Sequence, residues 1–187
     1  NNLGIVSSLL DLQSAEMRDP KVVEAIHESQ NRVYSMSMIH QKLYQGKNLS
    51  AIEMKEYFLE LSDHILDSFG LKNRIEFGFN MEEIELDVDT AIPLGLIVNE
   101  LITNALKHAF PKDRKGRIEL YFRKKDDRTI RLEVTDIGLG IHEIVKTADK
   151  RSGFGTKLIG LLIQQLDATM NRKSDEGTAV RIEFNLA

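Results

Sequence analysis

The sequence predicts an α+β fold in which a helical hairpin precedes a mixed, largely antiparallel sheet with its helices on one face. Residues 3–43 repeat apolar side chains at steps of three and four, which is typical of packed helices. Residues 118–134 and 178–184 instead alternate apolar and polar side chains, which is typical of half-buried strands. Residues 91–110 form a long amphipathic segment, which we expect to be a helix that packs on the sheet.

The N-terminal part predicts two antiparallel helices. Asp19 is placed as the N-cap of the second helix and Pro20 as its first residue. Because both helices carry broad apolar faces, we expect two copies of the hairpin to form a four-helix bundle. Gly46 marks the boundary between this hairpin, residues 1–46, and a second domain, residues 47–187. The heptad positions are Leu3, Val6, Leu10, Gln13 and Met17, then Val22, Ile26, Ser29, Val33, Met36, His40 and Leu43.

The second domain is predicted to begin with a helix. Ser50 and Glu53 have the spacing of a capping box, so the helix should start at Ser50, and Gly70 should end it. Two strands are expected to follow, at Ile75–Phe79 and Ile84–Val88. The residues that this helix should bury are Ile52, Phe58, Leu61 and Ile65.

The C-terminal half predicts most of the sheet. Ile118–Phe122 and Ile130–Val134 flank the polar turn Lys125–Arg128, which is typical of a β-hairpin. The remaining predicted elements are a helix that opens at Gly153 and continues through Leu166, and strands at Ala168–Asn171 and Thr178–Phe184.

The long central helix carries three polar residues on one face. At about 100° per residue, Asn104 and Lys107 lie within about 40° of Glu100. A carboxylate, a carboxamide and an ammonium group this close are compatible with a solvated face that contains an ion pair, or with a functional site. The opposite, apolar face contains Val98, Leu101, Ile102, Ala105 and Ala109.

Two glycine pairs follow the central helix. Asp136 ends a predicted strand, and Gly138 and Gly140 after it permit positive φ and close backbone approach. A simple turn capped by Asp136 explains the same residues. Gly153 and Gly155 open a predicted helix, and the free N–H groups and positive dipole end of a helix N-terminus favour phosphate.

In this order, the three segments resemble the Bergerat ATP-binding fold of histidine kinases, type II topoisomerases, Hsp90 chaperones and MutL mismatch-repair proteins. Asn99–Phe110 resembles the N box, Asp136–Gly140 the first glycine box and Gly153–Leu158 the second. Any one of these motifs would be a weak signal alone. The resemblance implies that residues 47–187 form an α/β sandwich of this type, which binds ATP and Mg²⁺.

The resemblance also implies roles for the polar groups. Asp136 would accept a hydrogen bond from the adenine amino group, and Asn104 would bind Mg²⁺, an ion that needs only one or two protein ligands. Glu100 would activate a water, as in the ATPases, or help to position or deprotonate an attacking imidazole, as in the kinases. The other implied nucleotide contacts are Lys107, His108, Gly138, Gly140, Gly153, Gly155, Thr156, Leu158 and Thr178.

The hairpin distinguishes between these relatives. Asn1–Gln13, Glu28–Val33 and Ile39–Tyr44 are similar to the dimerisation and phosphotransfer helices of the HisKA_2 class of sensor histidine kinases, and Asp89–Gly95 fits the same class. The resemblance implies a homodimer that forms through the hairpin. It also implies transfer of the γ-phosphoryl group of ATP to a histidine, and then to an aspartate in the receiver domain of a response regulator.

The phosphorylated histidine of this class lies four residues before the Asn-Asn-Leu motif, which here begins at Asn1. We therefore expect the chain to be the C-terminal portion of a longer protein, unable to autophosphorylate in the usual way. His27 and His40 lie on the second helix, where a bundle-lining role is expected.

The composition narrows the function classes. A net charge of −4 argues against a general nucleic-acid binder, and the absence of cysteine excludes thiolate metal sites and thiol nucleophiles. No apolar run has the roughly 18 residues of a membrane span, so we expect no membrane contact. An ATP-dependent domain should be cytoplasmic. Two alternatives stay open: an ATPase in which Glu100 activates water, and a non-catalytic, nucleotide-gated dimer that acts as a scaffold.

Overall fold

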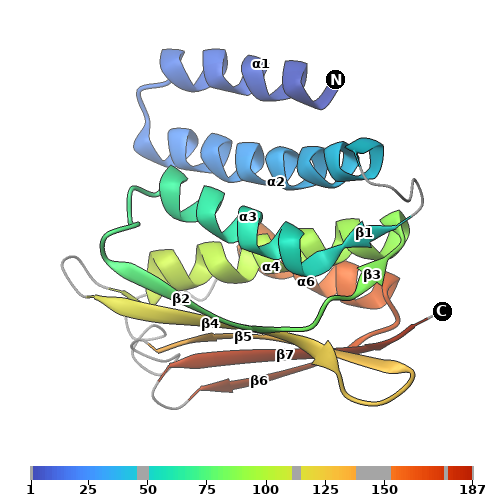
Figure 1. The fold of residues 1–187 in the computed structure, drawn as a ribbon. Helices are drawn as coiled ribbons and strands as arrows, with labels where there is room; N and C mark the ends of the chain where they lie inside the picture. Colours follow the sequence, from blue (N-terminus) through green and yellow to red (C-terminus); the bar gives the residue numbers. More distant parts are fainter. Residues whose placement is uncertain (1, 46–50, 111–114, 138–152, 175–176, 187) are drawn as a thin grey trace.

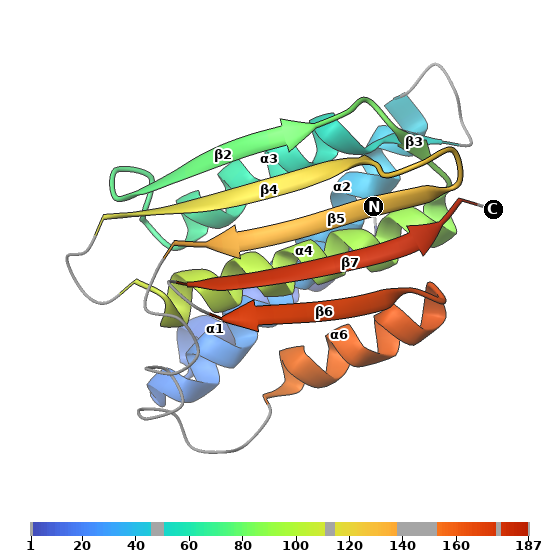
Figure 2. The same ribbon diagram turned by 90° about the horizontal axis from the view of Figure 1, so that it is seen from below.

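The computed structural model describes residues 2–45, 51–110, 115–137, 153–174 and 177–186. These residues form layers: a helical hairpin lies outermost, three further helices lie beneath it, and a five-stranded sheet lies beneath them (Figure 1). Seen from below, the sheet lies in front of the helices, so all the described helices are on the same side of it (Figure 2). The predicted α+β class is confirmed.

The hairpin consists of α1 (Asn2–Glu16) and α2 (Pro20–Gln45). The carboxylate of Asp19 accepts a hydrogen bond of 2.9 Å from the backbone N–H of Lys21, which confirms the predicted cap. Helix α1 lies on the far side of α2 from the sheet (Figure 1). Its apolar side chains therefore have a solvent-facing side, and Ile5, Leu9 and Leu12 are each more than half exposed.

The helix start predicted at Ser50 is wrong. Ile52 and Glu53 form strand β1 (Ile52–Glu53), which pairs antiparallel with β3 (Glu85–Leu86), and α3 runs from Met54 to Ser68. This pairing fixes an extended backbone where the capping box predicted the first helical turn. Glu53 caps α3 itself, because its carboxylate accepts from the N–H groups of Lys55 and Glu56 at 2.9 and 2.7 Å.

The other predictions for α3 hold. Gly70 adopts a φ of +64°, and the N–H of Leu71 donates to the carbonyl of Leu66 over 3.0 Å, which is the arrangement of a Schellman helix end. The predicted core residues of this segment are fully buried: Ile52, Phe58, Leu61 and Ile65.

The sheet has the strand order β2-β4-β5-β7-β6, with β2 and β4 parallel and the other pairs antiparallel. Its helix-facing side forms the core, because alternate residues of the central strands are buried. The register places Asp136, the last residue of β5, opposite Thr178, the first of β7. The strands are β2 (Ile75–Met81), β4 (Gly116–Lys124), β5 (Thr129–Asp136), β6 (Thr169–Ser174) and β7 (Thr178–Asn185).

The central helix is α4 (Val88–His108), and α6 (Phe154–Gln165) lies beside it. Helix α4 begins three residues before the predicted Ala91, because Asp87 caps it by accepting from the N–H of Thr90 at 2.8 Å. It lies between α2 and the sheet, so both its apolar and its polar faces are largely buried. No helix among the described residues is both long and apolar enough to cross a membrane.

Candidate functional site

A cavity of about 370 Å³ lies between α4, α6 and the strands β5, β6 and β7. Ligand pockets in proteins usually span roughly 300–1,000 Å³. Leu158 packs against the core instead of lining the cavity, and Gly138 and Gly140 lie outside the described residues. The structure does bring together nine predicted site residues around the cavity: Glu100, Asn104, Lys107, His108, Asp136, Gly153, Gly155, Thr156 and Thr178.

The carboxylate of Asp136 is buried in this cavity. The β5–β7 register brings it to Thr178, whose backbone N–H donates to Oδ1 over 3.1 Å. Burial raises the pKa of Asp136, while the hydrogen bonds from Thr178 and the charge of Arg172 oppose the rise. A buried carboxylate needs such partners, and it remains a strong acceptor for a ligand that brings a donor.

The walls around Asp136 are mainly apolar. One polar exception is Thr103, whose buried Oγ1 has no hydrogen-bond partner in the part of the chain that the structure describes. A flat apolar ring with an amino group at its edge fits these walls, because the ring can pack on them and the amino group can donate to Asp136. Adenine is such a group. The apolar residues that line the cavity are Leu101, Ala105, Ala109, Val134, Phe154, Ile159, Met170 and Val180.

The N-terminus of α6 forms another wall. Gly153 is its N-cap and has no side chain to satisfy the first N–H groups, so these groups and the positive helix dipole favour an anion. A Cβ atom at Gly155 would collide with Oε2 of Glu100. Glycine therefore allows α6 to approach the polar face of α4 closely.

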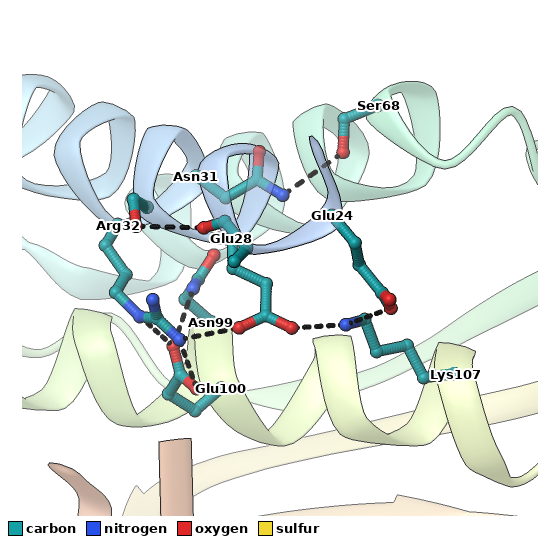
Figure 3. Close-up of polar contacts among 10 residues, drawn as sticks. Glu24, Glu28, Asn31, Arg32, Ser68, Asn99, Glu100 and Lys107 are labelled. Carbon is teal, nitrogen blue, oxygen red and sulfur yellow. Dashed lines mark hydrogen bonds and ion pairs between the residues drawn. The ribbon is translucent and has the colours of Figure 1, made fainter. Parts of the chain in front are cut away.

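Glu100 on α4 is held by a residue of the hairpin. The Nε and Nη2 atoms of Arg32 on α2 donate to Oε1 and Oε2 of Glu100 over 2.6 and 3.1 Å (Figure 3). Both side chains are largely buried, 12% and 4% exposed respectively. The guanidinium carbon of Arg32 also lies 5.0 Å from the ring centroid of Phe154 at the start of α6. Arg32 therefore connects α2, α4 and α6 at the edge of the cavity.

Lys107 on α4 is also held by residues of α2. Its ammonium group forms ion pairs with Glu28 and, over 2.6 Å, with Glu24, and Glu28 also pairs with Arg32 at 3.2 Å (Figure 3). Burial lowers the pKa of Lys107, but the two carboxylates outweigh it and the pKa lies above its ordinary value. Burial raises the pKa of Glu28, but Lys107 and Arg32 outweigh it and the pKa lies below its ordinary value. Lys107 and Glu28 are therefore both charged at neutral pH.

His108 lines the cavity beside Lys107. Burial lowers its pKa, and the nearby ammonium of Lys107 lowers it further, against the opposing effect of Glu24 and Glu28. The imidazole is consequently neutral at pH 7 and can both donate and accept a hydrogen bond.

Two oxygen-bearing side chains on α4 could contribute to a magnesium site. Asn104 lies one turn after Glu100, and both line the cavity. Among the residues that the structure describes, no group of three His, Cys, Asp or Glu side chains is placed to hold a metal ion. Magnesium usually keeps several waters and binds one or two protein groups together with phosphate oxygens. The donors fit Mg²⁺ that enters with a nucleotide.

Helix α2 contributes charged side chains to the site that were not predicted from the sequence. Glu24, Glu28 and Arg32 recur at intervals of four residues, which places three charges on one face of α2. That stripe was visible in the sequence, but its partner helix was not. Met170 and Arg172, alternate residues of the edge strand β6, also line the cavity without having been predicted.

Together, the helix-covered sheet, the buried acceptor and the uncapped helix end define a nucleotide-binding α+β domain. Residues 76–184 match the family described as histidine kinase-like ATPase domain, and residues 1–69 match a family described as histidine kinase. The chain belongs to the histidine kinase-like ATPase domain family. The resemblance predicted from its three motifs is thereby confirmed.

Individual relatives agree with this assignment. The whole chain is 26% identical to Blue-light-activated histidine kinase 2 of Erythrobacter litoralis and covers 54% of it. It is also 26% identical, over 96% of its length, to the sensor histidine kinase PdtaS of Mycobacterium tuberculosis and covers 36% of it. Among solved structures, the chain matches the histidine kinase domain of the blue-light activated histidine kinase EL346 of Erythrobacter litoralis. The match covers all of this chain and 86% of that domain, with 26% identity and a TM-score of 0.74. The chain thus spans about half of the first relative and about a third of the second.

Proposed function

We propose that this chain is the ATP-binding catalytic core of a two-component sensor histidine kinase. Such an enzyme transfers the γ-phosphoryl group of ATP to a histidine and then to an aspartate in the receiver domain of a response regulator. One arrangement carries the proposal: a single cavity combines the buried acceptor Asp136 with the uncapped N-terminus of α6 and the ammonium of Lys107. An adenine ring needs an acceptor for its amino group, and a phosphate chain needs N–H donors and positive charge.

In this proposal the base binds at the inner wall of the cavity. Asp136 accepts a hydrogen bond from the adenine amino group, and the N–H of Thr178 keeps the carboxylate in place. The apolar walls pack on the ring, and the Oγ1 of Thr103, which has no partner among the described residues, gains one. The burial that raises the pKa of Asp136 also excludes water, which would otherwise compete for this hydrogen bond.

The phosphates bind toward α6 and the end of α4. The N–H groups that follow Gly153, including those of Gly155 and Thr156, donate to phosphate oxygens, and Lys107 and His108 contribute side-chain donors. Asn104 holds Mg²⁺ through its amide oxygen. When bound, Mg²⁺ supplies positive charge that neutralises the phosphates.

Glu100 is the proposed catalytic residue. Its carboxylate is buried beside the N-terminus of α6, where it can accept a proton or hydrogen bond from the attacking imidazole. In this conformation the carboxylate accepts hydrogen bonds from Arg32 and, over 3.4 Å, from the amide of Asn99. Release from Arg32 would free the carboxylate for this role.

The hairpin supplies the proposed partners. We infer that residues 1–46 form the dimerisation and phosphotransfer unit and residues 47–187 the ATP-binding unit. The exposed apolar side chains of α1 support pairing with the hairpin of a second copy. The receiver domain of a response regulator is the second partner. The proposed location is the cytoplasm, without nucleic-acid or membrane contact.

Labelled ATP tests the activity. We would incubate γ-labelled ATP and Mg²⁺ with this chain, and with a version that includes the histidine-bearing segment that the class places before Asn1. Acid-labile, base-stable label on the extended version alone is the expected result. Steady release of free phosphate would favour the ATPase alternative, and nucleotide binding without label or hydrolysis would favour the scaffold.

A further inference from the structure

Lys107 belongs to the cavity and to the hairpin contact at the same time. Its side chain lines the cavity together with Glu28, and its ammonium group forms ion pairs with Glu28 and Glu24. A lysine has three N–H donors and no acceptor. In this conformation α2 carboxylates therefore hold a cation that also faces the ligand cavity.

The charge of the whole cluster opposes an anion. The carboxylates of Glu24, Glu28 and Glu100 face the cations of Arg32 and Lys107, so three negative charges against two positive charges leave a net charge of −1. Asp136 adds another carboxylate to the same cavity and Arg172 adds a cation, so the net charge stays at −1. Polyphosphate that enters this arrangement meets repulsion unless a carboxylate leaves Lys107.

Glu28 is the carboxylate that is placed to leave Lys107 when a phosphate binds. It lines the cavity, whereas Glu24 does not, and its side chain is 29% exposed against 56% for Glu24. A carboxylate that binds an ammonium group at the cavity wall resembles a phosphate oxygen in charge and in hydrogen bonding. The α2 carboxylates and a nucleotide phosphate thus need the same donors.

We propose that the carboxylate of Glu28 occupies the position beside Lys107 that a nucleotide phosphate would take. Helix α2 then determines how strongly the site distinguishes ATP from adenosine. This inference rests on the proposed nucleotide site and adds a competitor to it. Because binding linkage is reciprocal, ATP must also weaken the contact between α2 and α4. Adenosine has no phosphate, so its affinity is independent of Glu28.

Binding measurements separate this competition from a structural role. We would measure the affinities of the whole chain for Mg²⁺–ATP and for adenosine by isothermal titration calorimetry, together with its thermal unfolding. In Glu28→Gln, ATP affinity should rise about fivefold, the scale of one partly buried ion pair, while adenosine affinity stays within about twofold. Glu24→Gln should raise ATP affinity about twofold, since Glu24 is more exposed.

The matched control is Glu60→Gln. It removes the same charge from an ion pair with Lys42, at 2.7 Å, in which the Glu60 side chain is 50% exposed, and neither residue lines the cavity. Its ratio of ATP to adenosine affinity should equal that of the unchanged chain. Equal ratios in all variants, or a lower ratio in Glu28→Gln, would overturn the inference. If Glu28→Gln does not fold, an unchanged ratio in Glu24→Gln overturns it instead. Failure of the unchanged chain to bind either ligand would refute the nucleotide site itself.

Discussion

Arg32 and Glu100, 68 residues apart, form a two-bond ion pair that connects helix α2 of the hairpin to the central helix α4. The carboxylate side chain of Glu100 is only 4% exposed. A charge this buried is stable because its partner is present, and removing the partner leaves it uncompensated. The pair therefore couples the packing of α2 to the state of the proposed catalytic residue.

Arg32→Ala should lower the free energy of unfolding by about 3 kcal/mol, because it leaves Glu100 buried without its cation. Urea denaturation at pH 7 measures this change. The control is Arg123→Ala, which breaks an ion pair with Glu82 whose side chains are 43% and 36% exposed. An exposed pair contributes at most about 1 kcal/mol. Losses of equal size would show that the buried position of Glu100 carries no special cost.

Asp136→Asn should weaken ATP binding at least tenfold, since a hydrogen bond to a buried charged group contributes roughly 1.5–3 kcal/mol. The same change should stabilise the ligand-free chain at pH 7. The folded-state pKa of Asp136 is raised, so the buried carboxylate is a cost that grows as pH rises through that pKa. Calorimetric titration and thermal unfolding check the two effects. Lower stability at pH 7 together with unchanged ATP affinity would contradict both.

Local patterns in the sequence were sufficient to predict much of the fold and of the site. The helical period placed Glu100, Asn104 and Lys107 on one face of α4, and strand alternation placed Asp136 at the end of β5. Each prediction depends on residues that are neighbours along the chain. The structure adds which face of which element meets another.

The features that were missed depend on distant pairing. Strand β1 has two residues, too few for a period, and its partner β3 lies about 30 residues further along the chain, so the capping box suggested a helix instead. The charged stripe that contains Arg32 was likewise visible on α2, but its partner on α4 is set by tertiary packing. Helical spacing cannot indicate which helix a polar stripe will face.

Gly155→Ala should destabilise the chain by about 1–3 kcal/mol and weaken ATP binding, because its Cβ would displace Glu100 and disturb the first turn of α6. Gly160→Ala is the control on the same helix. Among the described residues, no atom beyond the neighbouring backbone of the helix itself lies within 4 Å of a Cβ placed at Gly160, so this substitution should stabilise the helix by roughly 0.5–1 kcal/mol. Denaturation and ATP titration of both variants give the comparison. Stabilisation by Gly155→Ala would mean that the close approach of α4 and α6 is not required.

Acid should release the contact between α2 and α4 through Glu28. Its pKa is lowered in the folded chain, because Lys107 and Arg32 outweigh the effect of burial. A carboxylate with a lowered pKa stabilises the fold above its unfolded-state pKa and loses this contribution as pH falls through the folded-state value. The stability difference between the unchanged chain and Glu28→Gln should thus be constant above about pH 5 and shrink below the ordinary glutamate value of 4.5. Urea denaturation of both proteins between pH 3 and pH 7 measures that difference. A difference that stays constant down to pH 3 would show that the charge of Glu28 does not hold α2 against α4.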